Sequence, residues 1–390
     1  MSEPYALLVV GGGPAGLSAV RAYRDAGGYG AVAIVADEGR MPYNRPPLTK
    51  DLLRGESDET DLPLEDEAWL DERSVDLVAG RAVSIDADRR TVRLSGGREL
   101  GYAACLLATG AEPTRLPIPG GDRPWVHVVR TVEHVQRLTA RLGEAARAVV
   151  IGSGFIGCEI AASLRARGHP VDLVSDEPAP NCGRLGEPQA RILEEWLAEA
   201  GVGLHLGEAV QDIERTDGAV TVRTDTARVE GDAVVMATGV APRSELAAQA
   251  GLELEGGAIP VSATMRTARD GLLAAGDVCL ANNLAAGRPL RVEHWGDALG
   301  QGAIAGQTAA GVEAAWDEVP GFWSTIGSHT LKYAAWGDGF DATRLHRDGH
   351  GAFVAWYGRE GRIVGVLTHE RDEDYDRGRD LIAEGAPWPP

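Results

Sequence analysis

The residues near the N-terminus that are best suited to chemistry are three glycines in a G-x-G-x-x-G pattern: Gly11, Gly13 and Gly16. They follow the apolar residues 7–10 and precede an alanine-rich segment, which predicts a buried parallel strand, a tight turn and a helix. In such a unit the first glycine makes the turn, the second lets the backbone approach a pyrophosphate, and the third lets the helix pack closely on the strand. Because the helix N-terminus offers free N–H groups to phosphates, this stretch predicts a dinucleotide site.

An acidic residue at the end of the next apolar run supports this interpretation. Residues 31–36 are apolar or small and lead directly to Asp37. A carboxylate at that place can accept hydrogen bonds from the hydroxyls of an adenosine ribose. The alternative is an ordinary strand–turn–helix unit that binds no nucleotide, but the complete context of strand, helix and acid favours the nucleotide.

The same pattern occurs a second time in the middle of the chain. Residues 148–151 are apolar, and Gly152, Gly154 and Gly157 repeat the glycine spacing. The next predicted strand covers residues 171–174. Two complete fingerprints in one chain predict two bound dinucleotides.

The residues after this strand bear on the type of nicotinamide cofactor. Ser175, Asp176 and Glu177 follow it directly. Carboxylates suit the free 2′-hydroxyl of NAD better than the 2′-phosphate of NADP, so we expect NADH to be preferred. Arg184 lies a few residues downstream and keeps NADPH open as the less favoured alternative.

The composition is that of a globular chain with large cores. It has 390 residues, 44% of them hydrophobic, and a net charge of −20, which predicts two or three domains and argues against nucleic acid and anionic membranes as partners. The first residues lack a basic leader and no apolar run reaches the length of a membrane helix, so we expect a cytoplasmic protein. Cys105, Cys158, Cys182 and Cys279 are scattered without a C-x-x-C motif, which predicts no metal site and disfavours a thiol–disulfide reductase.

The remaining stretches outline the domain organisation. Residues 111–121 are rich in proline and glycine and indicate a linker between two domains. The composition shifts again at residue 320, where aromatic residues become frequent. Residues 352–357 and 363–368 predict a β-hairpin, and residues 374–383 predict a closing helix. The end of the chain is therefore expected to form a small α+β domain.

Three further segments carry a family resemblance. Residues 42–50 read Pro-Tyr-Asn-Arg-Pro-Pro-Leu-Thr-Lys, and the segments Gly276-Asp277 and Glu293-His294-Trp295 follow much later. Together with the two glycine patterns, they resemble the ferredoxin reductase family of pyridine-nucleotide flavoproteins, which includes the putidaredoxin, rubredoxin and biphenyl-dioxygenase reductases and apoptosis-inducing factor. The resemblance extends over nearly the whole chain.

The resemblance implies an α/β fold of two Rossmann-like dinucleotide-binding domains and a small α+β C-terminal domain. Residues 1–112 and 246–318 would form a discontinuous FAD-binding domain. Residues 113–245 would form an NAD-binding domain inserted into it, and residues 319–390 a C-terminal interface domain.

The resemblance also implies site residues by position. Asp37 would bind the adenosine ribose, Asp277 the ribityl chain, and Lys50 would lie near flavin N5, paired with Glu159. Trp295 is either a flavin contact or part of the core. The residues expected to bind FAD or NAD are Gly11, Gly13, Pro14, Ala15, Gly16, Asp37, Arg45, Lys50, Val83, Ala108, Thr109, Gly110, Gly152, Gly154, Phe155, Ile156, Gly157, Glu159, Asp176, Gly239, Gly276, Asp277, Glu293, His294 and Trp295.

The two residues expected to be catalytic are Lys50 and Glu159. A cation near N5 would stabilise the electron-rich reduced flavin. A carboxylate partner would limit the cost of burying that cation. Lys50 is one of only two lysines in the chain, the other being Lys332. The alternative is a surface lysine and a helix glutamate that never meet.

The leading functional hypothesis is a hydride relay from NADH to FAD, followed by single-electron transfer to an acceptor, most simply a [2Fe–2S] ferredoxin. A second hypothesis is an NADH oxidase or a reductase of a small organic molecule. A third is an NADH-sensing interaction protein similar to apoptosis-inducing factor. We expect a monomer or a homodimer.

Overall fold

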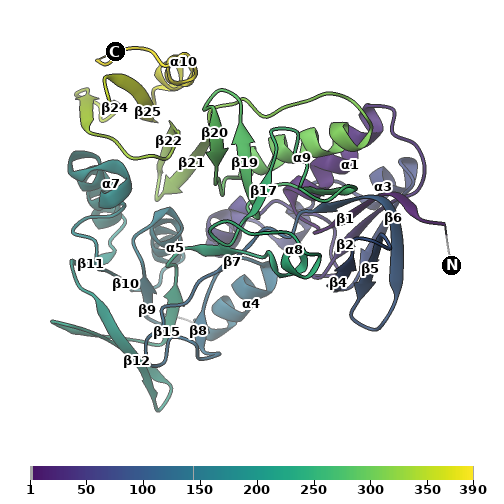
Figure 1. The fold of residues 1–390 in the computed structure, drawn as a ribbon. Helices are drawn as coiled ribbons and strands as arrows, with labels where there is room; N and C mark the ends of the chain where they lie inside the picture. The colour runs from purple at the N-terminus through teal and green to yellow at the C-terminus, as the bar shows by residue number, and fades with distance from the viewer. Residues whose placement is uncertain (1–2, 144, 390) are drawn as a thin grey trace.

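The N-terminal part of the chain forms a parallel sheet with an antiparallel extension. The computed structural model describes residues 3–143 and 145–389. The strand order is β3-β2-β1-β6-β5-β4, with β18 also pairing with β6 (Figure 1). All pairings among β3, β2, β1, β6 and β18 are parallel. The bounds are β1 (Tyr5–Val10), β2 (Val32–Ala36), β3 (Val75–Ala79), β4 (Ala82–Asp86), β5 (Thr91–Leu94), β6 (Glu99–Leu107) and β18 (Leu272–Ala274).

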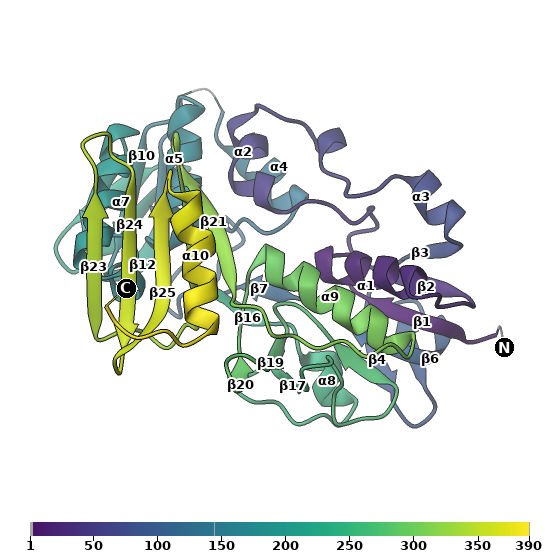
Figure 2. The same cartoon turned by 90° about the horizontal axis from the view of Figure 1, so that it is seen from above.

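The helices and small strands of this part surround that sheet and its carboxyl edge. Helix α1 (Pro14–Asp25) follows the first glycine pattern, and α9 (Trp295–Ala309) packs beside it (Figure 2). The other elements are η1 (Pro46–Thr49), α2 (Asp51–Arg54), η2 (Glu59–Asp61), α3 (Glu67–Glu72), α8 (Glu245–Gln249), β17 (Ile259–Val261), β19 (Cys279–Asn283) and β20 (Arg288–Leu290).

The middle of the chain forms a second parallel sheet. Its order is β11-β10-β9-β15-β8, and a separate meander β12-β13-β14 packs below it (Figure 1). The strand bounds are β8 (Val126–His127), β9 (Ala148–Ile151), β10 (Val171–Ser175), β11 (Gly203–Leu206), β12 (Val210–Thr216), β13 (Ala219–Thr224), β14 (Arg228–Gly231) and β15 (Ala233–Met236). The helix bounds are α4 (Val132–Arg141), α5 (Phe155–Ala166), α6 (Cys182–Leu185) and α7 (Glu187–Glu199).

A two-stranded antiparallel ribbon connects the two Rossmann-like parts. It consists of β7 (Ala111–Pro113) and β16 (Val240–Pro242), so both crossings between the parts lie side by side. The expected domain limits at 112/113 and 245/246 fall within β7 and at the start of α8. We propose these limits as the domain boundaries.

The C-terminal part is a five-stranded antiparallel sheet in the order β21-β22-β25-β24-β23, and helix α10 (Asp372–Ala383) covers one of its faces (Figure 2). Its strands are β21 (Gly321–Ile326), β22 (His329–Ala335), β23 (Ala342–Arg347), β24 (Phe353–Arg359) and β25 (Arg362–His369). The predicted hairpin is β24–β25. The predicted fold class of two Rossmann-like domains with a small α+β C-terminal domain is confirmed. In the part of the chain that the structure describes, no helix has the length and apolar character needed to cross a bilayer.

Two glycines of α9 permit close packing of α9 on α1. A Cβ atom at Gly302 would lie 2.2 Å from the carbonyl oxygen of Ala15, and one at Gly306 would lie 2.1 Å from that of Ala19. At Gly302 and Gly306 the backbones of α9 and α1 therefore come so close together that only glycine fits. Since α9 begins at Trp295, this packing also fixes one wall of the cavity described below.

Gly302→Ala is accordingly expected to lower the free energy of unfolding by about 1–3 kcal/mol, because the added methyl group forces the two helices apart. Gly300→Ala is the matched control. A Cβ atom there meets nothing within 4 Å, so this change is expected to be neutral or to stabilise the helix by about 0.5–1 kcal/mol. Urea unfolding followed by circular dichroism measures both variants. Equal midpoints for the two would contradict the close packing.

Candidate functional site

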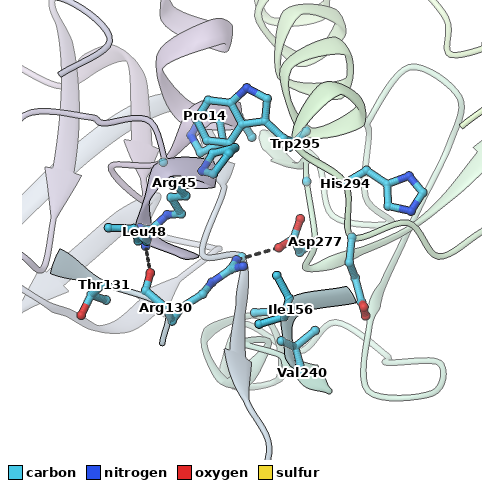
Figure 3. A pocket seen from close by; sticks show the side chains of 18 of the residues that line it. Pro14, Arg45, Leu48, Arg130, Thr131, Ile156, Val240, Asp277, His294 and Trp295 are labelled. Atoms are coloured by element: carbon cyan, nitrogen blue, oxygen red, sulfur yellow. Dashed lines mark hydrogen bonds and ion pairs between the residues drawn. The ribbon is translucent and has the colours of Figure 1, made fainter. Parts of the chain in front are cut away.

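A cavity of about 570 Å³ lies where the three parts of the chain meet. Its walls come from both glycine loops, the segment after β2, the strand ends after β6 and β18, and strand β21. Figure 3 shows ten of the lining residues with labels, among them Pro14 and Ile156 beside the two glycine loops. Nineteen of the expected site residues line it, namely Gly11, Gly13, Pro14, Ala15, Asp37, Arg45, Lys50, Ala108, Thr109, Gly110, Gly154, Phe155, Ile156, Gly239, Gly276, Asp277, Glu293, His294 and Trp295.

The first glycine loop has the geometry of a phosphate cradle. Gly11 has φ +132°, and a Cβ atom there would lie 2.1 Å from the carbonyl oxygen of Ala108. A Cβ atom at Gly13 would meet nothing within 4 Å, so the backbone there borders open space, and no side chain caps the start of α1. At Gly16 a Cβ atom would lie 2.3 Å from the carbonyl oxygen of Gly11. Turn, open approach and close packing thus fall on the first, second and third glycine.

The second glycine loop repeats this geometry. Gly152 has φ +104°, and a Cβ atom there would lie 2.4 Å from the carbonyl oxygen of Ala237. Gly154 again borders open space and precedes α5, whose start no side chain caps. A Cβ atom at Gly157 would lie 2.0 Å from the carbonyl oxygen of Gly152. The two loops therefore offer two equivalent anion sites at helix N-termini.

The charges around the cavity also suit phosphates. Seven cationic side chains line it against five carboxylates, although the chain as a whole carries a net charge of −20. The cationic residues are Arg40, Arg45, Lys50, Arg130, Arg184, Arg243 and Arg291, and the carboxylates are Asp37, Glu38, Glu177, Asp277 and Glu293. A locally positive cavity in an acidic protein favours anionic ligands.

A network beyond β2 fixes the segment that carries the family motif. Arg45 Nη2 lies 2.9 Å from Glu38 Oε1, and the hydroxyl of Tyr43 donates to Glu38 Oε2 at 2.7 Å. Burial raises the pKa of Tyr43 against the opposing charge of Arg45, and the Glu38 carboxylate raises it further, so this hydroxyl stays a donor. Asp37 extends from the same strand end and is half exposed, with Arg243 Nη1 at 3.7 Å.

The expected pair of Lys50 and Glu159 is present as an ion pair. Lys50 Nζ lies 2.7 Å from Glu159 Oε2 and 3.4 Å from the carbonyl oxygen of Pro46. The side chains of Lys50 and Glu159 are 12% and 3% exposed. An ammonium group has three donors, so one N–H of Lys50 is left for a group inside the cavity.

Asp277 is paired across the domain junction. Arg130 Nη2 donates to Asp277 Oδ2 at 2.7 Å, and Arg45 Nη1 donates to the carbonyl oxygen of Arg130 at 2.7 Å, so that the three residues form one chain of contacts (Figure 3). The side chain of Asp277 is 11% exposed. Gly276 N donates to Gln301 Oε1 of α9 at 2.9 Å, which fixes the turn that presents Asp277.

The segment before α9 forms the opposite wall. Glu293 pairs with Arg291 at 2.7 Å, and His294 Nδ1 lies 3.1 Å from Asp297 Oδ2. The His294 ring lies 4.6 Å from that of Phe322, between ring centroids. Trp295 is the first residue of α9 and lines the cavity, so the structure places it at the site rather than in the core.

Six expected site residues do not line the cavity: Gly16, Val83, Gly152, Gly157, Glu159 and Asp176. The three glycines among them are needed for the turn or for close packing of the helix on the strand. Glu159 lies behind the cavity wall, where it accepts a hydrogen bond from Lys50. Val83 lies on β4 with 38% of its surface exposed, because β4 belongs to the antiparallel extension and strand alternation turns this side chain to solvent. Asp176 is exposed, and its neighbour Glu177 faces the cavity instead.

Several of the lining residues, such as Glu38 and Arg130, were not among those expected from the sequence. Glu38 directly follows Asp37, so its position at a strand end was an available signal. Arg130 follows the two-residue strand β8, which is too short to show any periodicity. Among the described residues, the cavity lining includes no cysteine, and no cluster of three or more His, Cys, Asp or Glu side chains is placed to hold a metal ion.

Comparison with known proteins identifies the family. Residues 5–302 match the family model described as pyridine nucleotide-disulphide oxidoreductase, and residues 321–390 match the one described as reductase C-terminal. The chain is 33% identical to rhodocoxin reductase of Rhodococcus erythropolis, covering 98% of this chain and 91% of the relative. It is 32% identical to the ferredoxin–NAD(+) reductase component of the anthranilate 1,2-dioxygenase system of Burkholderia cepacia, over 99% of this chain and 95% of the relative.

Solved structures agree with this grouping. The ferredoxin reductase for the CYP199A2 system of Rhodopseudomonas palustris superposes with a TM-score of 0.92 at 30% identity, covering 98% of this chain and 95% of that chain. The reductase of the covalent putidaredoxin reductase–putidaredoxin complex gives a TM-score of 0.90 at 27% identity, covering 98% and 93%. The chain therefore belongs to the pyridine nucleotide-disulphide oxidoreductase family and is an FAD-dependent NAD(P)H oxidoreductase of the ferredoxin reductase type.

Proposed function

We propose that this protein takes a hydride from NADH onto FAD and passes the electrons singly to a [2Fe–2S] ferredoxin. The observation that carries the proposal is the ion pair of Lys50 and Glu159, which holds Lys50 in the wall of one cavity with residues of both glycine loops. FAD, when bound, supplies the chemistry of accepting two electrons as a hydride and releasing them one at a time.

The residues of the cavity fit FAD and NADH. The open backbone at Gly13 and the uncapped start of α1 suit the pyrophosphate of FAD. Asp37 suits a ribose because it ends β2 beside that loop, and Asp277 suits the ribityl hydroxyls because its carboxylate faces the same cavity. The second loop, at Gly154, suits the pyrophosphate of NADH.

Lys50 is proposed to supply the electrostatic part of catalysis. Its free N–H would donate to the flavin near N5, and its charge would stabilise the reduced ring. Glu159 holds the ammonium and neutralises it behind the cavity wall. The remaining walls orient the two cofactors and exclude water between them.

The acceptor is proposed from the relatives. The compared curated proteins include a rhodocoxin reductase and a ferredoxin–NAD(+) reductase component, and one of the solved structures is a complex of a reductase with putidaredoxin. Because the described cavity lining includes no cysteine, nothing in it favours a disulfide as acceptor. Steady-state reduction of a [2Fe–2S] ferredoxin by NADH under nitrogen tests the proposal. A quinone reduced in preference to ferredoxin would support an organic acceptor instead.

Glu177 is proposed to set the preference for NADH. Its carboxylate Oε2 accepts a hydrogen bond from Cys182 N at 2.8 Å and lines the cavity, so it is held where an adenosine ribose of NADH would lie. The 2′-phosphate of NADPH would be repelled by the Glu177 carboxylate, although the cationic Arg184 lies nearby on α6.

Glu177→Gln keeps an oxygen for Cys182 N but removes the charge. We expect it to raise kcat/KM for NADPH relative to NADH about tenfold, since it removes a like-charge contact. Asp176→Asn is the matched control on the neighbouring exposed residue and should leave the ratio within about twofold. A larger change for Asp176→Asn than for Glu177→Gln would assign the preference to Asp176.

A further inference from the structure

The carboxylate of Glu159 receives hydrogen bonds from two parts of the chain and itself belongs to a third. Its Oε2 accepts from Lys50 Nζ at 2.7 Å and from Thr49 Oγ1 at 2.5 Å, both in the FAD-binding part. Its Oε1 accepts from Ser324 Oγ at 2.7 Å and from Thr325 N at 3.3 Å, both on β21 of the C-terminal sheet. Glu159 itself lies on α5 of the inserted part. One oxygen is thus assigned to each flanking domain.

Because this junction is buried, the Glu159 carboxylate depends on each of its hydrogen-bond donors. Glu159, Ser324 and Thr49 are 2%, 1% and 5% exposed. A buried carboxylate that loses a donor must rotate toward the others, admit water or lose part of its charge stabilisation. The N–H of Thr325 is the longer of the two contacts on Oε1, so the hydroxyl of Ser324 is the main restraint on that side.

The position of Lys50 depends on that carboxylate. Its flexible side chain has two hydrogen-bond partners among the described residues, Glu159 Oε2 at 2.7 Å and the carbonyl oxygen of Pro46 at 3.4 Å. The second contact is long, so Glu159 fixes where the ammonium lies. A rotation of the carboxylate would therefore move the N–H that faces the cavity.

Strand β21 also builds part of the cavity wall. Phe322 and Trp323 line the cavity, and the Phe322 ring packs on that of Phe155 with centroids 4.8 Å apart. Ser324 follows directly on the same strand. A shift of β21 would therefore move both the aromatic wall of the cavity and the donors that hold the Glu159 carboxylate behind Lys50.

We propose that Ser324 is a positioning residue for hydride transfer: its hydroxyl, contributed by the C-terminal domain, holds Glu159 so that Lys50 points into the cavity. This inference rests on the proposed role of Lys50. It implies that the domain which resembles a reductase C-terminal domain also completes the reaction site.

The test is a double-mutant cycle on the FAD-loaded enzyme, with flavin reduction by NADH followed by stopped-flow absorbance under nitrogen. Ser324→Ala is expected to lower the limiting rate constant about tenfold and to leave the apparent Kd of NADH within about twofold. Combined with Lys50→Met, Ser324→Ala should produce less than about a twofold further loss, because its effect acts through Lys50. Thr330→Ala is the control, since it removes a hydroxyl from the neighbouring strand on the exposed side.

The outcomes separate the two proposals. If Ser324→Ala reduces the rate by the same factor with and without Lys50, Ser324 does not act through Lys50 and the inference is overturned. An unchanged rate in Ser324→Ala overturns it as well. An unchanged rate in Lys50→Met alone would instead remove the role of Lys50 from the proposed function. If Ser324→Ala does not load FAD, Ser324→Cys keeps the size with a weaker donor and should show a smaller loss that the Lys50→Met background again abolishes.

Discussion

Lys50→Met is expected to slow the reduction of bound FAD by NADH about 100-fold or more while the apparent Kd of NADH changes only a few-fold. Methionine keeps most of the length and the apolar stem of lysine but has no donor and no charge. The ammonium of Lys50 faces the cavity at 12% exposure, so its field acts where little water screens it. The effect should appear in the chemical step because the charge is needed most when the flavin becomes electron-rich.

The chain supplies a matched control for this experiment. Lys332 is the only other lysine, lies on β22 and pairs with Asp372 at 2.8 Å, outside the cavity lining. Lys332→Met should leave the rate constant unchanged within about twofold. Glu159→Gln should fall between the two, because it keeps an acceptor for Lys50 but removes the neutralising charge. A limiting rate constant for Lys50→Met equal to that of the unmodified enzyme would exclude Lys50 from the reaction.

Asp277→Ala is expected to purify without most of its FAD, with the Kd of FAD raised about 100-fold or more. The change removes the acceptor for ribityl hydroxyls and also leaves Arg130 without its partner at 2.7 Å. The guanidinium of Arg130 would then be left unpaired in a half-buried wall, which is unfavourable beside the uncharged ribityl chain of FAD. This loss would weaken the binding of FAD further. The absorbance ratio at 450 and 280 nm after purification, and reconstitution with added FAD, measure the effect.

Two variants control for the general loss of a carboxylate. Asp270→Ala removes an aspartate that is 87% exposed and pairs with Arg90 at 2.6 Å, away from the cavity lining, and it should retain full FAD. Asp277→Asn keeps an acceptor oxygen but no charge, and it should retain an intermediate amount. If Asp277→Ala is isolated with one FAD per chain, the ribityl assignment does not hold.

Much of the fold was predictable because its signals are local. The glycine spacings at Gly11 and Gly152, each after an apolar run, specify strand, turn and helix within about ten residues. The segment rich in small residues that begins at Trp295 forms helix α9. Its tight packing follows from glycines whose partners, on α1, lie far away in sequence.

The details of the site depended on contacts that no local pattern encodes. Ser324 meets Glu159 across 165 positions, and Arg130 meets Asp277 across 147. The choice between Asp176 and Glu177 depends on which way two adjacent side chains turn after β10, which a strand-end rule does not determine. The pairing of Lys50 with Glu159 was expected only because residues 42–50 resemble a known family motif.

The proposed function requires that electrons pass from NADH through FAD to a one-electron acceptor. It is tested most directly by reducing the FAD-loaded enzyme with one equivalent of NADH and mixing it in parallel with air-saturated buffer and with a [2Fe–2S] ferredoxin under nitrogen. We expect the flavin absorbance near 450 nm to bleach with NADH, to return rapidly with ferredoxin, and to return slowly with oxygen. Rapid return in air with no reaction of the ferredoxin would contradict the claim and identify an oxidase, whereas slow return in both would indicate an NADH-sensing protein.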